Sequence, residues 1–138
     1  MKISEKLRAA RKKISNPTNW TQGWFARDAE GKQCSAKDPE ATCWCAAGAI
    51  WSVDSEDLNR LWRLLEFRVG SLTYFNDTSF HEDVLKAFDR VIADAEAKEE
   101  RQAKQIAIES ARQIESAKQI ESAKQIESAK QIAIESTK

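Results

Sequence analysis

The aromatic residues of this 138-residue chain all lie within its first 88 positions. All four glycines and both prolines also come before residue 71, and a short repeat dominates the sequence beyond residue 97. Aromatic side chains supply much of the apolar area that a core needs, so a core can be built only from about residues 1–97. That length still folds alone. We therefore predict a compact domain over residues 1–97 and a separate tail over residues 98–138.

The domain sequence predicts an α+β fold that is mainly α, with about four helices and a short β-hairpin, followed by a long C-terminal helical repeat tail. Apolar residues recur at helical spacing after Ser4, which we expect to cap the first helix, and Asn16-Pro17 ends it. The segments Gly23–Arg27 and Lys32–Ser35 flank a glycine turn and predict the hairpin.

Three more helices are expected further along the domain. Asp38-Pro39-Glu40 carries a cap, a proline and an acid, which predicts a helix running to about Val53. A third helix is expected from Ser55 to Gly70. Residues 72–75 predict a short strand and residues 76–77 a turn. A capping box over residues 79–82 then starts the last core helix, which we expect to bury this apolar set: Phe80, Val84, Leu85, Phe88, Val91 and Ile92.

From Ala111 the tail repeats six residues, Ala-Lys-Gln-Ile-Glu-Ser, with arginine replacing lysine in the first copy. A step of three residues turns about −60° in an α-helix, so the apolar row winds around the rod. An isoleucine returns to the same face only from Ile114 to Ile132, which is too sparse for a coiled-coil seam. The repeat therefore predicts a solvated single helix, or a partly disordered tail. Self-association or partner binding through the tail stays open.

The charges balance, with 22 basic and 22 acidic residues. A balanced chain has no electrostatic footprint for nucleic acid or anionic lipid. The basic run Arg8–Lys13 fits a solvated helix end, with a nucleic-acid contact as the alternative. The N-terminus lacks an apolar signal-peptide core, and no stretch is apolar enough for a membrane span. The chain has three cysteines, an odd number that does not suggest a set of disulfides. We therefore expect a cytoplasmic protein with reduced thiols, whose partner, if any, is a protein.

The uncharged stretch Cys43-Trp44-Cys45 suggests either a metal site or a buried segment. Together with Cys34 and His81 it matches the four ligands of structural zinc. On a helix, however, residues i and i+2 point about 200° apart, so both cysteines cannot share one ion unless residues 43–45 are extended. A helix that is apolar all round is buried. We therefore predict a core helix and no metal or cofactor, and keep a small zinc-binding structural domain as an alternative.

Two further site hypotheses follow from the residue types. Cys43 near a helix start could act as a nucleophile, with His81 and Asp77 as base and orienting group.

Polar residues in aromatic company could instead line a binding cleft, and these are Gln22, Arg27, Asp28, Asn76 and Asp77. With His81 they would form a small ligand-binding domain or a hydrolase-like enzyme. The structural alternative makes Asp28 and Asp77 turn or cap residues, with Arg27 paired to one of them.

Several motifs together are similar to a small family of uncharacterised bacterial and phage proteins. The family has a W-T-Q-G…A-R-D segment, a C-W-C-x-x-G-A helix and a late N-D turn before a final helix. The matching segments are Trp20-Thr-Gln-Gly23, Ala26-Arg-Asp28, Cys43-Trp-Cys45, Gly48-Ala49 and Asn76-Asp77. The resemblance covers about residues 5–96 and implies a compact helical domain of intracellular bacterial or phage origin, with no assigned activity.

The sequence contains no strong catalytic constellation. It therefore favours a small non-enzymatic interaction or regulatory protein over an enzyme.

Overall fold

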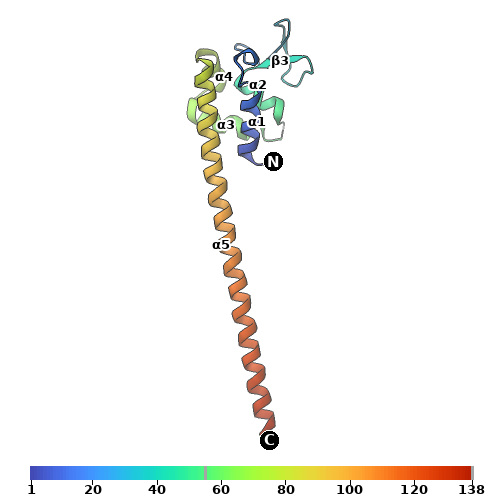
Figure 1. The fold of residues 1–138 in the computed structure, drawn as a ribbon, viewed down its shortest axis with the longest axis vertical. Helices are drawn as coiled ribbons and strands as arrows, with labels where there is room; N and C mark the ends of the chain where they lie inside the picture. The colour runs from blue at the N-terminus through green and yellow to red at the C-terminus, as the bar shows by residue number, and fades with distance from the viewer. Residues whose placement is uncertain (55, 138) are drawn as a thin grey trace. The chain divides into compact units, whose positions relative to one another are not determined.

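The computed structural model describes residues 1–54 and 56–137. The chain divides into two compact units, Met1–Ala97 and Lys98–Lys138. Five α-helices and one three-stranded antiparallel sheet lie in the described residues (Figure 1). The predicted α+β, mainly α class is confirmed, as is the long C-terminal helix. The elements follow in this order: α1 (Ile3–Lys13), a 3-10 turn (Pro17–Asn19), β1 (Ala26–Asp28), β2 (Gln33–Cys34), β3 (Ala41–Trp44), α2 (Ala46–Val53), α3 (Leu58–Val69), α4 (Leu72–Thr78) and α5 (His81–Ser136).

Helix α1 buries the stripe that its periodicity predicts. Leu7, Ala10 and Ile14 are completely buried. The helix begins two residues earlier than expected, with Lys2 at the N-cap. The prediction that Ser4 caps this helix is therefore wrong, and Ser4 is instead a buried residue of the first turn.

The sheet has the strand order β2-β1-β3 and is antiparallel throughout. The predicted hairpin is confirmed, because Ala26 pairs with Cys34. The other edge of β1 pairs with β3, which the sequence reading missed: Ala26 also lies opposite Trp44.

The predicted helix start at residues 38–40 is wrong. Asp38 Oδ1 accepts the N–H of Glu40 at 2.8 Å, and Asp38 O accepts the N–H of Ala41 at 3.0 Å, so this is a turn. A cap, a proline and an acid suit a tight turn as well as a helix start. The following Ala-Thr-Cys-Trp contains residues that favour strands, and it forms β3.

Helix α2 is the buried centre of the domain, and it packs against α1, α3 and α4. It starts at Ala46, with Cys45 at the N-cap accepting the N–H of Gly48 through Sγ at 3.3 Å. Residues 45–50 are buried, whereas Cys43, Trp44 and Trp51 are half-buried. The prediction of a helix buried all round therefore holds only for the first turns of α2.

Helix α3 buries Leu61 and Leu65 on the predicted stripe and stops at Gly70, whose φ of 77° suits a residue without Cβ. Its expected start, Ser55, lies outside the described residues.

The strand predicted at residues 72–75 and the turn at 76–77 are both wrong, because these residues form α4. Ser71 Oγ caps α4 at the N–H of Tyr74, and the carboxylate of Glu66 accepts the N–H of Leu72. These side-chain caps start a helix that local propensity alone does not suggest.

Helix α5 buries most of the predicted set, including Val84, Phe88, Val91 and Ile92. It begins at His81, so the predicted capping box at Ser79 is wrong, and Ser79 is the C-cap of α4. Phe80 is 79% exposed, so its predicted place in the core is also wrong. In the second unit the helix continues to Ser136, and the side chains of residues 100–137 are exposed.

The backbone of Phe25 lies so close to α2 that position 48 has room only for glycine. A Cβ built at this position would lie 1.9 Å from Phe25 O, the carbonyl that accepts the N–H of Cys45 at 3.1 Å. A helical Gly→Ala change normally stabilises, but here the contact is with backbone that cannot move aside.

We expect Gly48→Ala to destabilise the domain by about 3 kcal/mol or more through this overlap. Gly31→Ala is the control, since no atom lies within 4 Å of its Cβ and only its φ of 82° is unfavourable. That variant should lose about 1–2 kcal/mol. Urea denaturation checks both, and equal losses would contradict the backbone contact.

An ion-pair cluster fastens α1 to the connection between α2 and α3. Lys6 Nζ lies 2.5 Å from Asp54 Oδ2 and 2.6 Å from Asp57 Oδ2. The hydrogen bond from Lys6 holds the pKa of Asp54 below its usual value, and the two aspartates raise the pKa of Lys6.

Because the folded-state pKa of Asp54 is depressed, its contribution to stability is present above the unfolded pKa of about 3.9 and is lost as pH falls through the folded value. The contribution of Lys6 is lost only at strongly alkaline pH. We expect Asp54→Asn to be less stable than the native chain at pH 7, with a difference that shrinks as pH falls below about 3.9. Urea midpoints at pH 7 and at acidic pH test it, with Glu30→Gln in the exposed turn between β1 and β2 as the control. A stability difference that does not change with pH would contradict the assignment.

Candidate functional site

The amide of Asn76 is the centre of the polar residues that the sequence singled out. Asn76 is completely buried on α4. Its Oδ1 accepts the indole N–H of Trp20 at 2.8 Å and the backbone N–H of Ala46 at 3.0 Å. Its Nδ2 donates to Thr21 O at 3.0 Å and to Asp77 Oδ1 at 3.2 Å. Both donors and both acceptor positions of the amide are therefore used.

The loop of residues 20–23 is bound to α4 by further bonds around this amide. Gln22 Nε2 donates to Asn76 O at 3.0 Å and to Ser79 O at 3.2 Å. The N–H of Gly23 donates to Asp77 Oδ1 at 2.8 Å. We call Trp20, Gln22, Asn76 and Asp77 the Asn76 clamp, since together they join the loop, α2 and α4.

Arg27 and Asp28 organise the neighbouring backbone. Arg27 donates to Thr21 Oγ1, Gln22 O and Gly31 O at 3.1–3.3 Å, so its partners are neutral oxygens rather than an aspartate. Asp28 Oδ1 accepts the N–H groups of Glu30 and Lys32, both at 2.9 Å, and thereby closes the turn between β1 and β2.

The structure places the three candidate catalytic residues in separate bonds. His81 Nε2 lies 2.5 Å from Ile14 O, and its ring lies 5.3 Å from that of Trp20. Cys43 Sγ is 3.9 Å from Arg27 O on β1. Asp77 binds Gly23 and Asn76. Each candidate is thus engaged with backbone or with a structural amide instead of with the other two.

The candidate zinc ligands Cys43 and Cys45 do not lie within a helix, contrary to the prediction. Residues 43 and 44 are extended in β3 and Cys45 precedes α2, so the helical geometry used against a shared ion is wrong. Even so, Cys34 and Cys43 lie on strands at opposite edges of β1. Within residues 1–54 and 56–137, no group of three or more His, Cys, Asp or Glu side chains could hold one metal ion.

Two of the thiols, those of Cys34 and Cys45, do not have the properties of activated nucleophiles. Burial raises the pKa of Cys45, against smaller lowering by backbone N–H groups. Burial also raises the pKa of Cys34, and the charges of Asp38 and Asp28 add to the effect. A raised pKa keeps a thiol protonated, and the protonated form is not the nucleophile.

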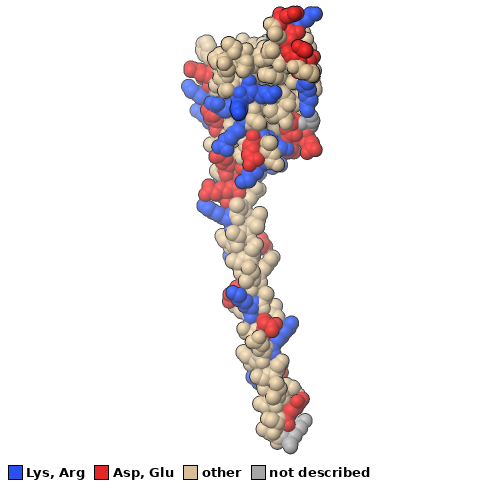
Figure 2. Space-filling model, turned by 45° about the vertical axis from the view of Figure 1, so that its right-hand side comes forward, with Lys and Arg blue, Asp and Glu red and all other residues tan. Residues whose placement is uncertain are grey.

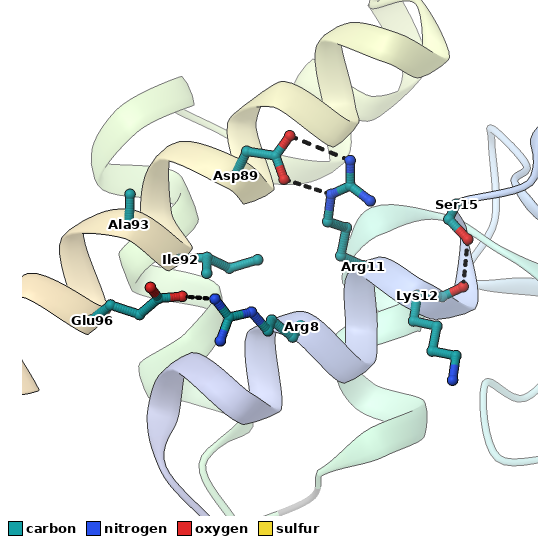
Figure 3. A pocket seen from close by; sticks show the side chains of 8 residues that line it. All are labelled: Arg8, Arg11, Lys12, Ser15, Asp89, Ile92, Ala93 and Glu96. Carbon is teal, nitrogen blue, oxygen red and sulfur yellow. Dashed lines mark hydrogen bonds and ion pairs between the residues drawn. The ribbon is translucent and has the colours of Figure 1, made fainter.

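A groove of about 520 Å³ runs between α1 and α5 of the first unit, and ion pairs cross it (Figure 3). Arg8 pairs with Glu96, and Arg11 Nε lies 2.6 Å from Asp89 Oδ1. Figure 3 shows both guanidinium groups directed at these carboxylates, with Ile92 between the two pairs.

Two of the four cations in the basic run of α1 are therefore paired with carboxylates. Besides the two arginines, Lys13 Nζ lies 4.4 Å above the ring of Trp44. Both basic and acidic side chains occur on the face shown in Figure 2. The sequence could not reveal this pairing, because Asp89 and Glu96 lie about eighty residues further along the chain.

A second hollow, of about 420 Å³, lies between the end of α1 and the turn before β3. It is lined by Lys13, Ala36, Lys37, Asp38, Pro39, Ala41, Trp44 and Ser52. None of the site residues predicted from the sequence lines either of these two hollows.

Residues 1–94 match a family described as "Family of unknown function (DUF6197)". The chain belongs to this family. The match confirms the predicted membership of an uncharacterised family. No curated protein and no solved structure matches the chain.

Two of the motifs that suggested the family, W-T-Q-G and N-D, meet at the Asn76 clamp of this DUF6197 domain. Trp20, Gln22 and Gly23 come from the W-T-Q-G segment, and Asn76 and Asp77 are the N-D pair. Residue types identified Gln22, Asn76 and Asp77 as candidate binding residues, but not their structural roles, because their partners are mostly backbone groups. In the described part of the chain, no helix combines the length and the apolarity needed to cross a membrane.

We expect Asn76→Ala to destabilise the DUF6197 domain by about 3–5 kcal/mol, because Trp20 Nε1, the N–H of Ala46 and Thr21 O would lose their buried partner. Asn59→Ala on the exposed side of α3 is the control and should stay within about 0.5 kcal/mol. Urea denaturation followed by tryptophan fluorescence measures both. Similar small effects would show that the clamp is not a structural centre.

Proposed function

We propose that the DUF6197 domain is a non-enzymatic protein-interaction module, and that its contact surface is the outer face of α3. The candidate catalytic and binding groups are already used in bonds that hold the fold together, so no observation favours an enzyme. The function must then come from what the domain presents to solvent.

Phe67 is the observation that carries the proposal, since 92% of its surface is exposed. Arg60, Arg63 and Leu64 lie three to seven residues before it, and this spacing brings them to the same side of α3. We call these four residues the α3 outer face. Leu64 is 37% exposed, and both arginines are exposed. Single exposed apolar residues are common on protein surfaces. Here an almost fully exposed phenylalanine lies beside an exposed leucine and two arginines, so the surface is both apolar and basic.

The charge of this face indicates the chemistry of its partner. Neither Arg60 nor Arg63 has a carboxylate within 4.0 Å in residues 1–54 and 56–137, in contrast to Arg68, which pairs with Asp94. Aromatic and arginine side chains are the residues most enriched in interface centres. A partner segment that joins apolar side chains with aspartate or glutamate would complement the face.

An intracellular setting belongs to the same proposal. All three cysteines are free thiols, and reducing compartments keep thiols unpaired.

Selection from a displayed library of amphipathic helical peptides, varied in charge, tests the proposal with the full chain as bait. We expect enrichment of peptides that combine apolar residues with Asp or Glu. Phe67→Ser and the double variant Arg60→Glu/Arg63→Glu should each weaken binding at least tenfold, which corresponds to roughly 1.4 kcal/mol.

Lys32→Glu/Lys37→Glu, two charge reversals at exposed positions away from α3, is the matched control and should leave binding unchanged. Circular dichroism first establishes that each variant is folded. Selected peptides that are basic or neutral would contradict the proposal, and so would peptides that bind Phe67→Ser as tightly as the native chain.

A further inference from the structure

The second unit is a long helix that has no buried face. Residues 100–137 are helical to Ser136, and all of their side chains are exposed. A helix without a buried face must be stabilised by contacts among its own side chains. Isolated helices are otherwise marginal in water.

Polar side chains supply such contacts along the unit. Lys104 Nζ lies 3.1 Å from Glu100 Oε1, four residues before it. Gln119 donates to Glu115 and Gln125 to Glu121, both at 3.5 Å and again across four residues. Each repeat also sets opposite charges three residues apart, and this row runs as Arg112, Glu115, Lys118, Glu121, Lys124, Glu127 and Lys130. Such pairs stabilise isolated helices by small increments that add up along a rod.

The apolar side chains are arranged so that they do not form a seam. Ile114, Ile120 and Ile126 are each 57–58% exposed. Six residues turn an α-helix by 600°, so successive isoleucines point about 120° apart. A coiled coil needs its apolar residues on one stripe every three to four residues. No single face therefore gathers enough apolar area for a lasting helix pair.

We propose that residues 98–137 act as a semi-rigid, single-helix spacer whose length is counted in hexads. Each Ala-Lys-Gln-Ile-Glu-Ser unit adds about 9 Å and turns the following residues back by about 120°. Three units restore the original direction. The number of repeats thus fixes both the separation and the relative direction of the two ends of the spacer. Charged helical linkers of this kind are known as semi-rigid spacers.

Pulsed dipolar spectroscopy on the full chain tests the spacer. Spin labels are attached through a ketone-bearing amino acid at Ser110 and Ser136, which spares the native cysteines. A helix of 26 residues places these positions about 39 Å apart, whereas a flexible coil averages about 28 Å with a broad distribution. One extra hexad after Ser128 should add about 9 Å to the helical distance but only about 3 Å to a coil. Six glycine and serine residues inserted there are the control, and they should broaden the distribution.

The role of the charges is tested with two matched variants. Glu115→Lys/Glu121→Lys/Glu127→Lys creates like-charge neighbours and should shorten and broaden the distance. Reversing every charge from Arg112 to Lys130 keeps the opposite pairs and should preserve the native distribution. Sedimentation of the native chain should give a monomer. A broad distance near the coil value, or association that disappears when residues 98–138 are removed, would overturn the spacer.

Discussion

The fold of the domain depends on one buried amide. The side chain of Asn76 satisfies the first N–H of α2, the indole of Trp20 and the carbonyl of Thr21 at the same time. Orphan N–H groups at a helix start need partners, and α2 packs against α1, α3, α4 and β3. Gly48 and Phe25 O then fix how closely the sheet approaches α2. Hydrogen bonds to the Asn76 amide thus position the loop and α4 relative to α2, which apolar packing alone would not do.

This arrangement changes how the motif residues are interpreted. Residues such as Gln22, Asp77 and His81 resemble a catalytic set in the sequence, but their polar atoms face backbone groups within the domain. A group whose hydrogen bonds are already satisfied gains little by binding a ligand. The surface that we propose for binding lies instead on the solvent side of α3, where Phe67 and two arginines are exposed.

Periodicity predicted those elements whose stability comes from an apolar face, such as α1, α3 and the core of α5. Prediction failed where side chains far along the chain or just beyond a turn decide the structure. Leu72–Thr78 forms a helix because Ser71 and Glu66 cap it, and residues 41–44 form a strand because β1 offers an edge. Among the candidate site residues, composition selected Asn76 and Gln22, but it could not show that their partners are carbonyl and N–H groups of distant segments. The solvated helix of the tail could be predicted because its apolar residues recur every three positions. Such a row winds around the helix and gives it no face that must be buried against another element.

Native-state hydrogen exchange by NMR tests the central claim most directly, since it reports on the two N–H groups that Asn76 accepts. If the clamp holds the fold, the backbone amide of Ala46 and the indole N–H of Trp20 should exchange only through global unfolding. Their free energies of exchange should then equal the free energy of unfolding measured with urea. Exchange of either proton at much lower free energy, through local opening of the loop, would contradict the account.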